Sequence, residues 1–152
     1  MNNNSFSNQK NEQYAKACLI FAKRLGLIDD DSLEAAKKRC DAENAKREIQ
    51  LKNGEIFYGL THYSFPAYLQ HELTKFRLDF VSEDEKIKKS YSYKEISRRD
   101  AKDFFKKNKD LFTRYNGDRF TFKEVKMIIE KKIREEEYEN EINSILCQLA
   151  DR

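Results

Sequence analysis

Few side chains in this chain could do chemistry. Its two histidines, His62 and His71, lie nine positions apart and lack the clustered thiols and carboxylates that would complete a zinc site. Its three cysteines, Cys18, Cys40 and Cys147, are odd in number and widely spaced, which is not the pattern of a disulfide framework or a Cys-x-x-Cys metal site. We therefore predict no metal ligands.

No pattern in the sequence is typical of an enzyme active site. The four glycines are isolated from one another, so they form no glycine-rich loop to cradle a phosphate, and there is no Gly-x-Ser-x-Gly nucleophile motif. Acidic residues are plentiful, but they alternate with lysine and arginine, which indicates salt-bridged helix surfaces. We predict that the protein is not an enzyme and binds no cofactor.

The charge of the chain is high but balanced. Its 152 residues include 30 Lys and Arg against 27 Asp and Glu, so 38% of the chain is charged while the net charge is only +3. Nucleic-acid-binding domains usually carry a stripe of one sign and a pI above about 9, whereas the pI here is about 8.6. We therefore expect no nucleic-acid partner.

Apolar runs are short throughout the sequence. The longest, from Ala17 to Ala22, falls far below the roughly 20 residues that span a bilayer, so membrane insertion is not expected. The first residues, Met1 to Phe6, lack the basic start and apolar core of a secretory signal. As written, the sequence predicts a cytoplasmic protein, or an extracytoplasmic one if an export signal lies outside it.

Composition favours helices over strands. Four Gly, one Pro and two Val are too few for a fold of many tight turns and β-branched strands. Apolar side chains instead recur at three- and four-residue spacing, which is the helical period. Residues 1–9 are rich in Asn and Ser and are predicted to form a flexible tail, while residues 10–152 form one all-α domain of about five helices.

Capping residues and glycines mark the ends of these helices. Gly26 ends the first helix, and Asp31 is expected to open the second. The helices are predicted at about 12–25, 31–52, 64–80, 97–112 and 121–150. The last is the longest, and a charged stretch separates its two apolar halves. We expect each half to pack on different helices, with the C-terminal helix returning across the N-terminal ones.

Aromatic residues are the distinctive feature of the sequence, with 11 Phe and eight Tyr. A dense cluster lies between the second and third predicted helices and comprises Phe57, Tyr58, Tyr63, Phe65 and Tyr68. These rings either fill the junction between helices or form a shallow apolar surface for extended polypeptide. They are the candidate peptide-binding residues.

Two stretches of the chain share a pattern with a known family. The first comprises Glu43–Arg47, Asn53–Gly59 and Phe65–Phe80, and the second comprises Asp103–Phe112, Phe120–Lys126 and the long charged helix. Together they resemble the helical chaperone module of SurA/PrsA-type foldases, the parvulin-linked peptidyl-prolyl isomerases of bacteria. The resemblance implies that an N-terminal helical region and a returning C-terminal helix pack together as a chaperone-like domain.

In that family a parvulin domain of about a hundred residues separates the two helical regions. Here only the seven residues Thr113–Arg119 occupy the matching position, so the resemblance implies the chaperone module without isomerase activity. The predicted function is non-catalytic binding of non-native or extended polypeptide through the aromatic cluster. The alternative is an adaptor for a specific protein partner, or a homodimer, in which Tyr138 to Leu149 pairs with another chain.

Overall fold

A computed structural model of the protein describes residues 3–152, with side chains from residue 8 onward. Over this part of the chain it contains six α-helices, one short 3₁₀-helix and no β-strand. The elements are α1 (Asn3–Arg24), α2 (Leu33–Lys52), α3 (Phe65–Val81), α4 (Glu85–Lys88), α5 (Arg98–Lys107), η1 (Lys109–Phe112) and α6 (Phe122–Ala150). The predicted all-α class is confirmed, and the helix beyond the expected five is the four-residue α4.

Hydroxyl side chains begin the longer helices after α1. Ser64, Ser97 and Thr121, at the predicted starts of three helices, are N-caps, and each accepts a hydrogen bond from the backbone N–H three residues further on. The cap of α2 is Ser32 rather than Asp31. Because a capping side chain reaches only the first turn of its own helix, these starting points follow from local sequence.

The first helix is longer than its sequence suggests. α1 begins at Asn3 rather than near Glu12, so residues 3–9 of the predicted tail form its first turns, and residues 1–2 of that tail lie outside the described residues. Extending an existing helix orders only one residue per added hydrogen bond, so weak helix formers such as Asn and Ser can continue it. The helix ends at Arg24, and Gly26 two residues later has a left-handed φ of 76°, which suits the predicted helix stop.

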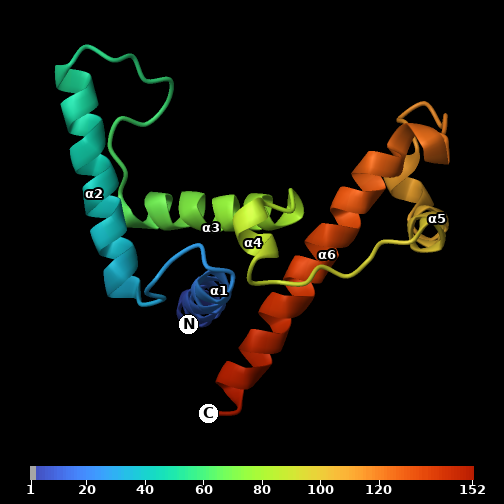
Figure 1. Cartoon of the computed structure of the whole chain (residues 1–152), viewed down its shortest axis with the longest axis horizontal. Coiled ribbons are helices and arrows are strands. Elements are labelled where there is room, and N and C mark those ends of the chain that lie inside the picture. Colours follow the sequence, from blue (N-terminus) through green and yellow to red (C-terminus); the bar gives the residue numbers. More distant parts are fainter. Residues whose placement is uncertain (1–2) are drawn as a thin grey trace.

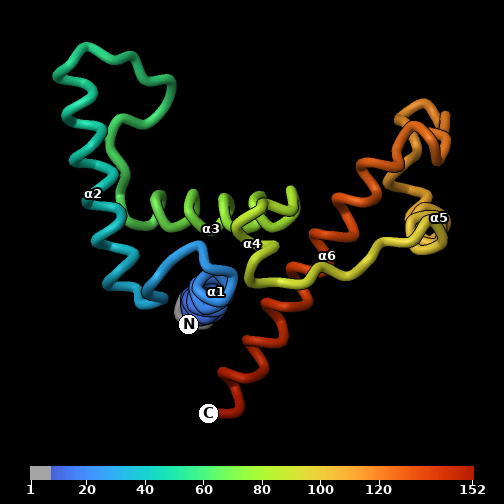
Figure 2. The backbone as a smooth tube through the Cα atoms, viewed as in Figure 1, coloured from blue at the N-terminus to red at the C-terminus, as the bar shows by residue number. Residues whose placement is uncertain are grey.

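Two arms extend from a central body (Figure 1). The body comprises α1, α3, α4 and the C-terminal half of α6. One arm, the α2 arm, is α2 with the loop of residues 53–64, which returns to α3. The other, the α5 arm, comprises residues 97–131, namely α5, η1 and the first part of α6. The backbone trace shows the arms diverging on either side of α3 (Figure 2).

The two halves of α6 are buried in different cores, as predicted. In the body, Tyr138 of α6 packs with Phe21 of α1 and Phe80 of α3, and the three ring centroids lie 5.4–5.7 Å apart. The buried residues of the α5 arm form a separate, smaller core, made of Ala101, Phe112, Val125 and Ile129. Helix α6 is thus the element that joins the α5 arm to the body.

The chain turns straight back between α5 and α6. The Phe120 N–H donates to the Phe112 carbonyl at 2.9 Å, and Thr113 and Arg119 form an isolated antiparallel bridge. Gly117 adopts a left-handed φ of 88° in this turn. The final helix then runs back to pack on α1 and α3.

Charged side chains in the middle of α6 are buried, although the sequence there looks like a solvated face. Arg134 and Glu137 are 7% and 6% exposed and pair at 2.6 Å. Arg134 also donates to Glu83 at 2.7 Å and to the Lys94 carbonyl at 2.6 Å. Burial alone would lower the pKa of Arg134, but these hydrogen bonds outweigh it and raise the pKa. The network ties the connector before α5 to α6.

Candidate functional site

Two side chains of α2 hold the loop of the α2 arm. The Asn44 side chain binds Tyr63 at two points, since its amide donates to the Tyr63 carbonyl at 2.9 Å and its oxygen accepts from the Tyr63 N–H at 2.8 Å. Arg47 lies three residues later on the same helix face, where it donates to the Leu60 carbonyl and to the Tyr63 hydroxyl. The loop is therefore held along the side of α2.

Arg47 also supports two aromatic rings of the loop. Its guanidinium carbon lies 4.5 Å from the centre of the Tyr63 ring and 5.4 Å from that of Phe57. Its Nε donates to the Glu43 carboxylate at 2.9 Å, which fixes the orientation of the guanidinium plane. Cation–π contacts of this kind contribute about 0.5–1 kcal/mol each at exposed sites. The inner side of the loop is thus held by α2.

A bidentate ion pair ties the base of the arm to α3. Arg39 donates from Nε and Nη2 to the two oxygens of Glu72 at 2.6 and 3.1 Å, and the Tyr68 hydroxyl donates to the same carboxylate at 3.2 Å. Burial raises the pKa of Tyr68 to about 12, and the Glu72 charge acts in the same direction. Glu72 is 7% exposed, so its carboxylate is largely shielded from water, and the ion pair fixes the position of α2 relative to α3.

The five predicted contact residues lie in different environments. Tyr58 is 97% exposed at the outer side of the loop. Phe57, Tyr63 and Phe65 are half-buried, each beneath a cationic side chain of α2. Tyr68 is also half-buried, and its ring lies 5.9 Å from that of Tyr63. The structure therefore brings four of the five into the junction between α2, the loop and α3, while Tyr58 projects into solvent.

Besides Tyr58, four aliphatic side chains of the α2 arm are exposed, and the sequence pattern did not select them. We define the α2-arm patch as the large apolar residues of this arm that are 41–97% exposed, namely Ile49, Leu51, Ile56, Tyr58 and Leu60. For Ile56, Tyr58 and Leu60, the available signal was the stretch between α2 and α3, where large apolar residues occur without a helical or strand period. Such residues have no regular face to bury, so they remain on the surface.

The C-terminal half of α6 is covered within the chain. Tyr138, Ile142 and Ile145 are each at most 1% exposed and belong to the same core as α1, and Leu146 and Leu149 pack partly buried against it. Helix α1 therefore occupies the face through which the homodimer alternative would pair with another chain.

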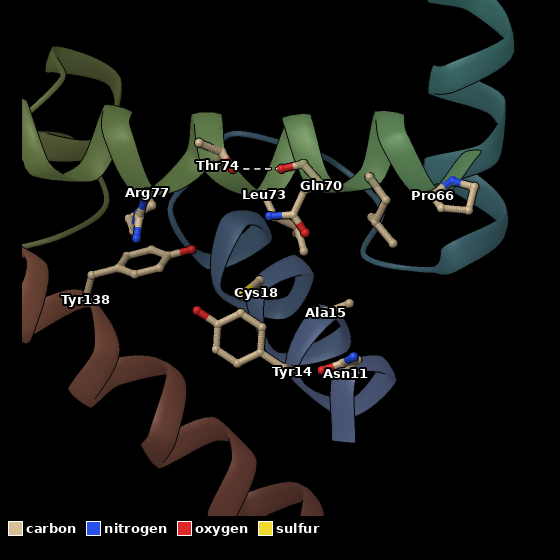
Figure 3. A pocket seen from close by; sticks show the side chains of 11 residues that line it. Asn11, Tyr14, Ala15, Cys18, Pro66, Gln70, Leu73, Thr74, Arg77 and Tyr138 are labelled. Carbon is tan, nitrogen blue, oxygen red and sulfur yellow. Dashed lines mark hydrogen bonds between the residues drawn. The ribbon is translucent and has the colours of Figure 1, made fainter. Parts of the chain in front are cut away.

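A cavity of about 380 Å³ lies between α1 and α3, next to α6 (Figure 3). The hydroxyls of Tyr14 and Tyr138 and the thiol of Cys18 lie around it. The Tyr138 hydroxyl is buried beside Cys18 but makes no hydrogen bond of good geometry within the described residues. Burial raises the pKa of Cys18 to about 11, so the thiol is protonated at neutral pH and is a poor nucleophile.

The remaining titratable side chains do not gather into a site. Within residues 8–152, no group of three or more His, Cys, Asp or Glu side chains is arranged to hold a metal ion. His62 is exposed on the loop, and His71 stacks on Tyr63 with ring centroids 5.6 Å apart. The buried carboxylates Glu72 and Glu137 are both paired with arginines. Over residues 3–152, every helix is too short or too polar to traverse a bilayer.

Comparison with known proteins places the fold but not the family. No protein-family model and no curated protein sequence matches this chain. Two solved structures are similar to it, the native and selenomethionine forms of the GH136 lacto-N-biosidase from Eubacterium ramulus. Each is 24% identical, with a TM-score of 0.75, and covers 90% of this chain. At this identity the likeness shows a shared all-helical fold.

The lengths of the two proteins differ greatly. The matched region covers 28% of the native hydrolase chain and 27% of the selenomethionine form, so this chain spans less than a third of that protein. This chain therefore has an all-helical fold that also occurs as one part of a longer polypeptide, the GH136 lacto-N-biosidase. The resemblance to SurA/PrsA-type foldases is not addressed by these structures and stays a prediction.

Proposed function

We propose that this protein is a non-catalytic, chaperone-like module that binds non-native or extended polypeptide through the α2-arm patch. The observation that carries the proposal is the exposure of five large apolar side chains on one arm. Large apolar side chains that stay exposed close together along the chain often mark interaction sites. Tyr58, at 97% exposed, is the aromatic residue best placed to contact a client.

The support beneath the patch suits this role. Asn44 and Arg47 hold the loop before a client arrives, so binding does not have to order it, and the entropic cost of association falls. Burying one large apolar side chain contributes about 1.5–3 kcal/mol. Because such burial is non-directional, the patch would accept many sequences. Association costs at least about 4 kcal/mol, so capture of three such side chains leaves about 0.5–5 kcal/mol, and each client is held weakly.

The proposal is tested with a client that cannot refold, such as reduced and carboxymethylated α-lactalbumin carrying a fluorescent label. Fluorescence anisotropy measures its affinity for the wild-type chain and for the variant Ile56→Ser/Tyr58→Ser/Leu60→Ser. We expect the variant to bind at least about tenfold more weakly, since three exposed apolar contacts are lost.

The matched control is Leu78→Ser. Leu78 is 58% exposed, like Leu60, but lies on α3 outside the patch. Its substitution should leave client affinity within about twofold, because it removes no proposed contact. Equal binding by the triple variant and the wild type would refute the proposed surface, and no client binding by the wild type would refute the function.

A second candidate function is docking to one dedicated, folded partner. The fold likeness favours it, because the matching region is a minor part of the chain named as a GH136 lacto-N-biosidase. On this ground the chain would serve as the helical component of a larger glycan-acting assembly. Cross-linking in the source cells followed by native mass spectrometry separates the two candidates. A dedicated partner gives one complex of fixed stoichiometry, whereas a chaperone gives many substoichiometric clients.

A further inference from the structure

The positive charge of this protein is concentrated on the α5 arm. Residues 97–131 contain 11 Lys and Arg against six Asp and Glu, a net charge of +5. The other 117 residues contain 19 basic against 21 acidic side chains, a net charge of −2. The nearly neutral composition of the whole chain therefore hides a strongly basic arm joined to a slightly acidic remainder.

Most cations on this arm form no ion pair within it. Among the described residues, the ion pair within the arm is Lys126 with Glu130, at 4.0 Å. Lysines and arginines along α5 and η1 are exposed and make no ion pair with any described residue, namely Arg98, Arg99, Lys102, Lys106, Lys107 and Lys109. Two of the six acids, Asp100 and Glu124, are engaged in capping boxes. The arm thus presents positive charge to a partner.

Large apolar side chains are exposed on the same arm. Leu111 on η1, Tyr115 in the turn, and Met127 and Ile128 on α6 are all more than half exposed. They project outside the small core of the arm, which buries Val125 and Ile129 from the same stretch of α6. Exposed apolar residues with charged residues around them are the usual composition of a protein interface.

From this combination we propose that the α5 arm docks an acidic polypeptide surface that has apolar residues at its centre. The lysines and arginines would steer and orient an acidic partner, and burial of Leu111, Met127 and Ile128 would supply affinity. The phosphates of a nucleic acid would neutralise the positive charges, but they have no apolar surface to cover these exposed side chains. A polypeptide partner is therefore favoured. This surface is separate from the α2-arm patch, so one chain can bind a client and an acidic partner together.

The test uses the full chain and a fluorescent peptide of repeated Glu-Glu-Leu triplets. The charge variant is Lys106→Gln/Lys107→Gln/Lys109→Gln, and the apolar variant is Met127→Gln/Ile128→Gln. We expect peptide affinity to fall at least about tenfold for the first and at least about fivefold for the second. All five positions are exposed, so both variants should keep the wild-type unfolding midpoint.

The control for net charge is Lys38→Gln/Lys46→Gln/Lys52→Gln, which neutralises three exposed lysines of α2. Its affinity for the peptide should stay within about twofold of the wild type. An equal loss for the α2 control, or no binding of the peptide to the wild type, overturns the proposal. Tighter binding of a DNA duplex, unchanged by the apolar variant, also overturns it and assigns the arm to nucleic acid.

A further variant separates this inference from the proposed function. Ile56→Ser/Tyr58→Ser/Leu60→Ser removes the α2-arm patch and should leave binding of the acidic peptide unchanged within about twofold. If that variant instead lost the acidic peptide, the binding site would lie on the α2 arm, and the α5 arm would not be the docking surface.

Discussion

Replacing Arg39 with methionine should loosen the attachment of α2 to the body. Arg39 donates three hydrogen bonds, two to the Glu72 carboxylate and one to the Asp30 carbonyl. Methionine has a similar helix propensity and an unbranched stem, so the substitution removes the charge and the hydrogen bonds while keeping α2 helical. It leaves the buried Glu72 carboxylate with the Tyr68 hydroxyl as its remaining partner.

The size of the effect follows from burial. Removing one partner of a buried ion pair costs about 3–5 kcal/mol. The Glu72 side chain is 8% exposed but that of Arg39 is 26% exposed, so water reaches the gap. We therefore expect the lower end of the range, about 3 kcal/mol. For a domain of this length that corresponds to a fall of about 6–12 °C in the thermal midpoint.

Urea unfolding followed by circular dichroism measures the loss, with Lys52→Met as the matched control. Lys52 pairs with Glu48 at 3.2 Å on the same helix, but both side chains are about 70% exposed, so its substitution should cost less than about 0.5 kcal/mol. The double variant Arg39→Met/Glu72→Met should recover most of the stability, because neither side chain is then charged. A single variant as stable as the wild type would refute this reasoning.

Two further predictions concern buried groups of the body. Tyr138→Phe should leave the free energy of unfolding unchanged or raise it by about 1 kcal/mol, because the buried hydroxyl makes no hydrogen bond within the described residues. Urea unfolding measures this change. A loss of more than about 1 kcal/mol would mean that the hydroxyl is hydrogen-bonded. With a thiol reagent at about pH 8, one of the three cysteines should react rapidly, and Cys147→Ser should abolish this rapid reaction. The Cys147 side chain is exposed, whereas burial raises the pKa of both Cys18 and Cys40. Rapid reaction of two thiols would contradict the prediction that Cys147 alone is accessible.

Local features of the sequence predicted most of the secondary structure. Ser64, Ser97 and Thr121 mark helix starts because a capping hydroxyl bonds within its own first turn. Gly26 marks a helix end because its left-handed φ is a property of that one residue. The two-part apolar pattern of the last helix likewise indicated two separate packing sites. The start of α1 was missed, because composition does not show how far an established helix extends.

Burial and exposure were decided by partners distant in sequence. Tyr58 and Tyr63 belong to one loop and one aromatic cluster, yet Tyr63 is held by Asn44 and Arg47 of α2 whereas Tyr58 projects into solvent. Sequence pattern could select the region of the candidate site but not its exposed members. A capping or turn preference acts over about four residues, whereas a side chain is covered only when the fold brings another element over it. The contact surface is therefore a property of the tertiary structure.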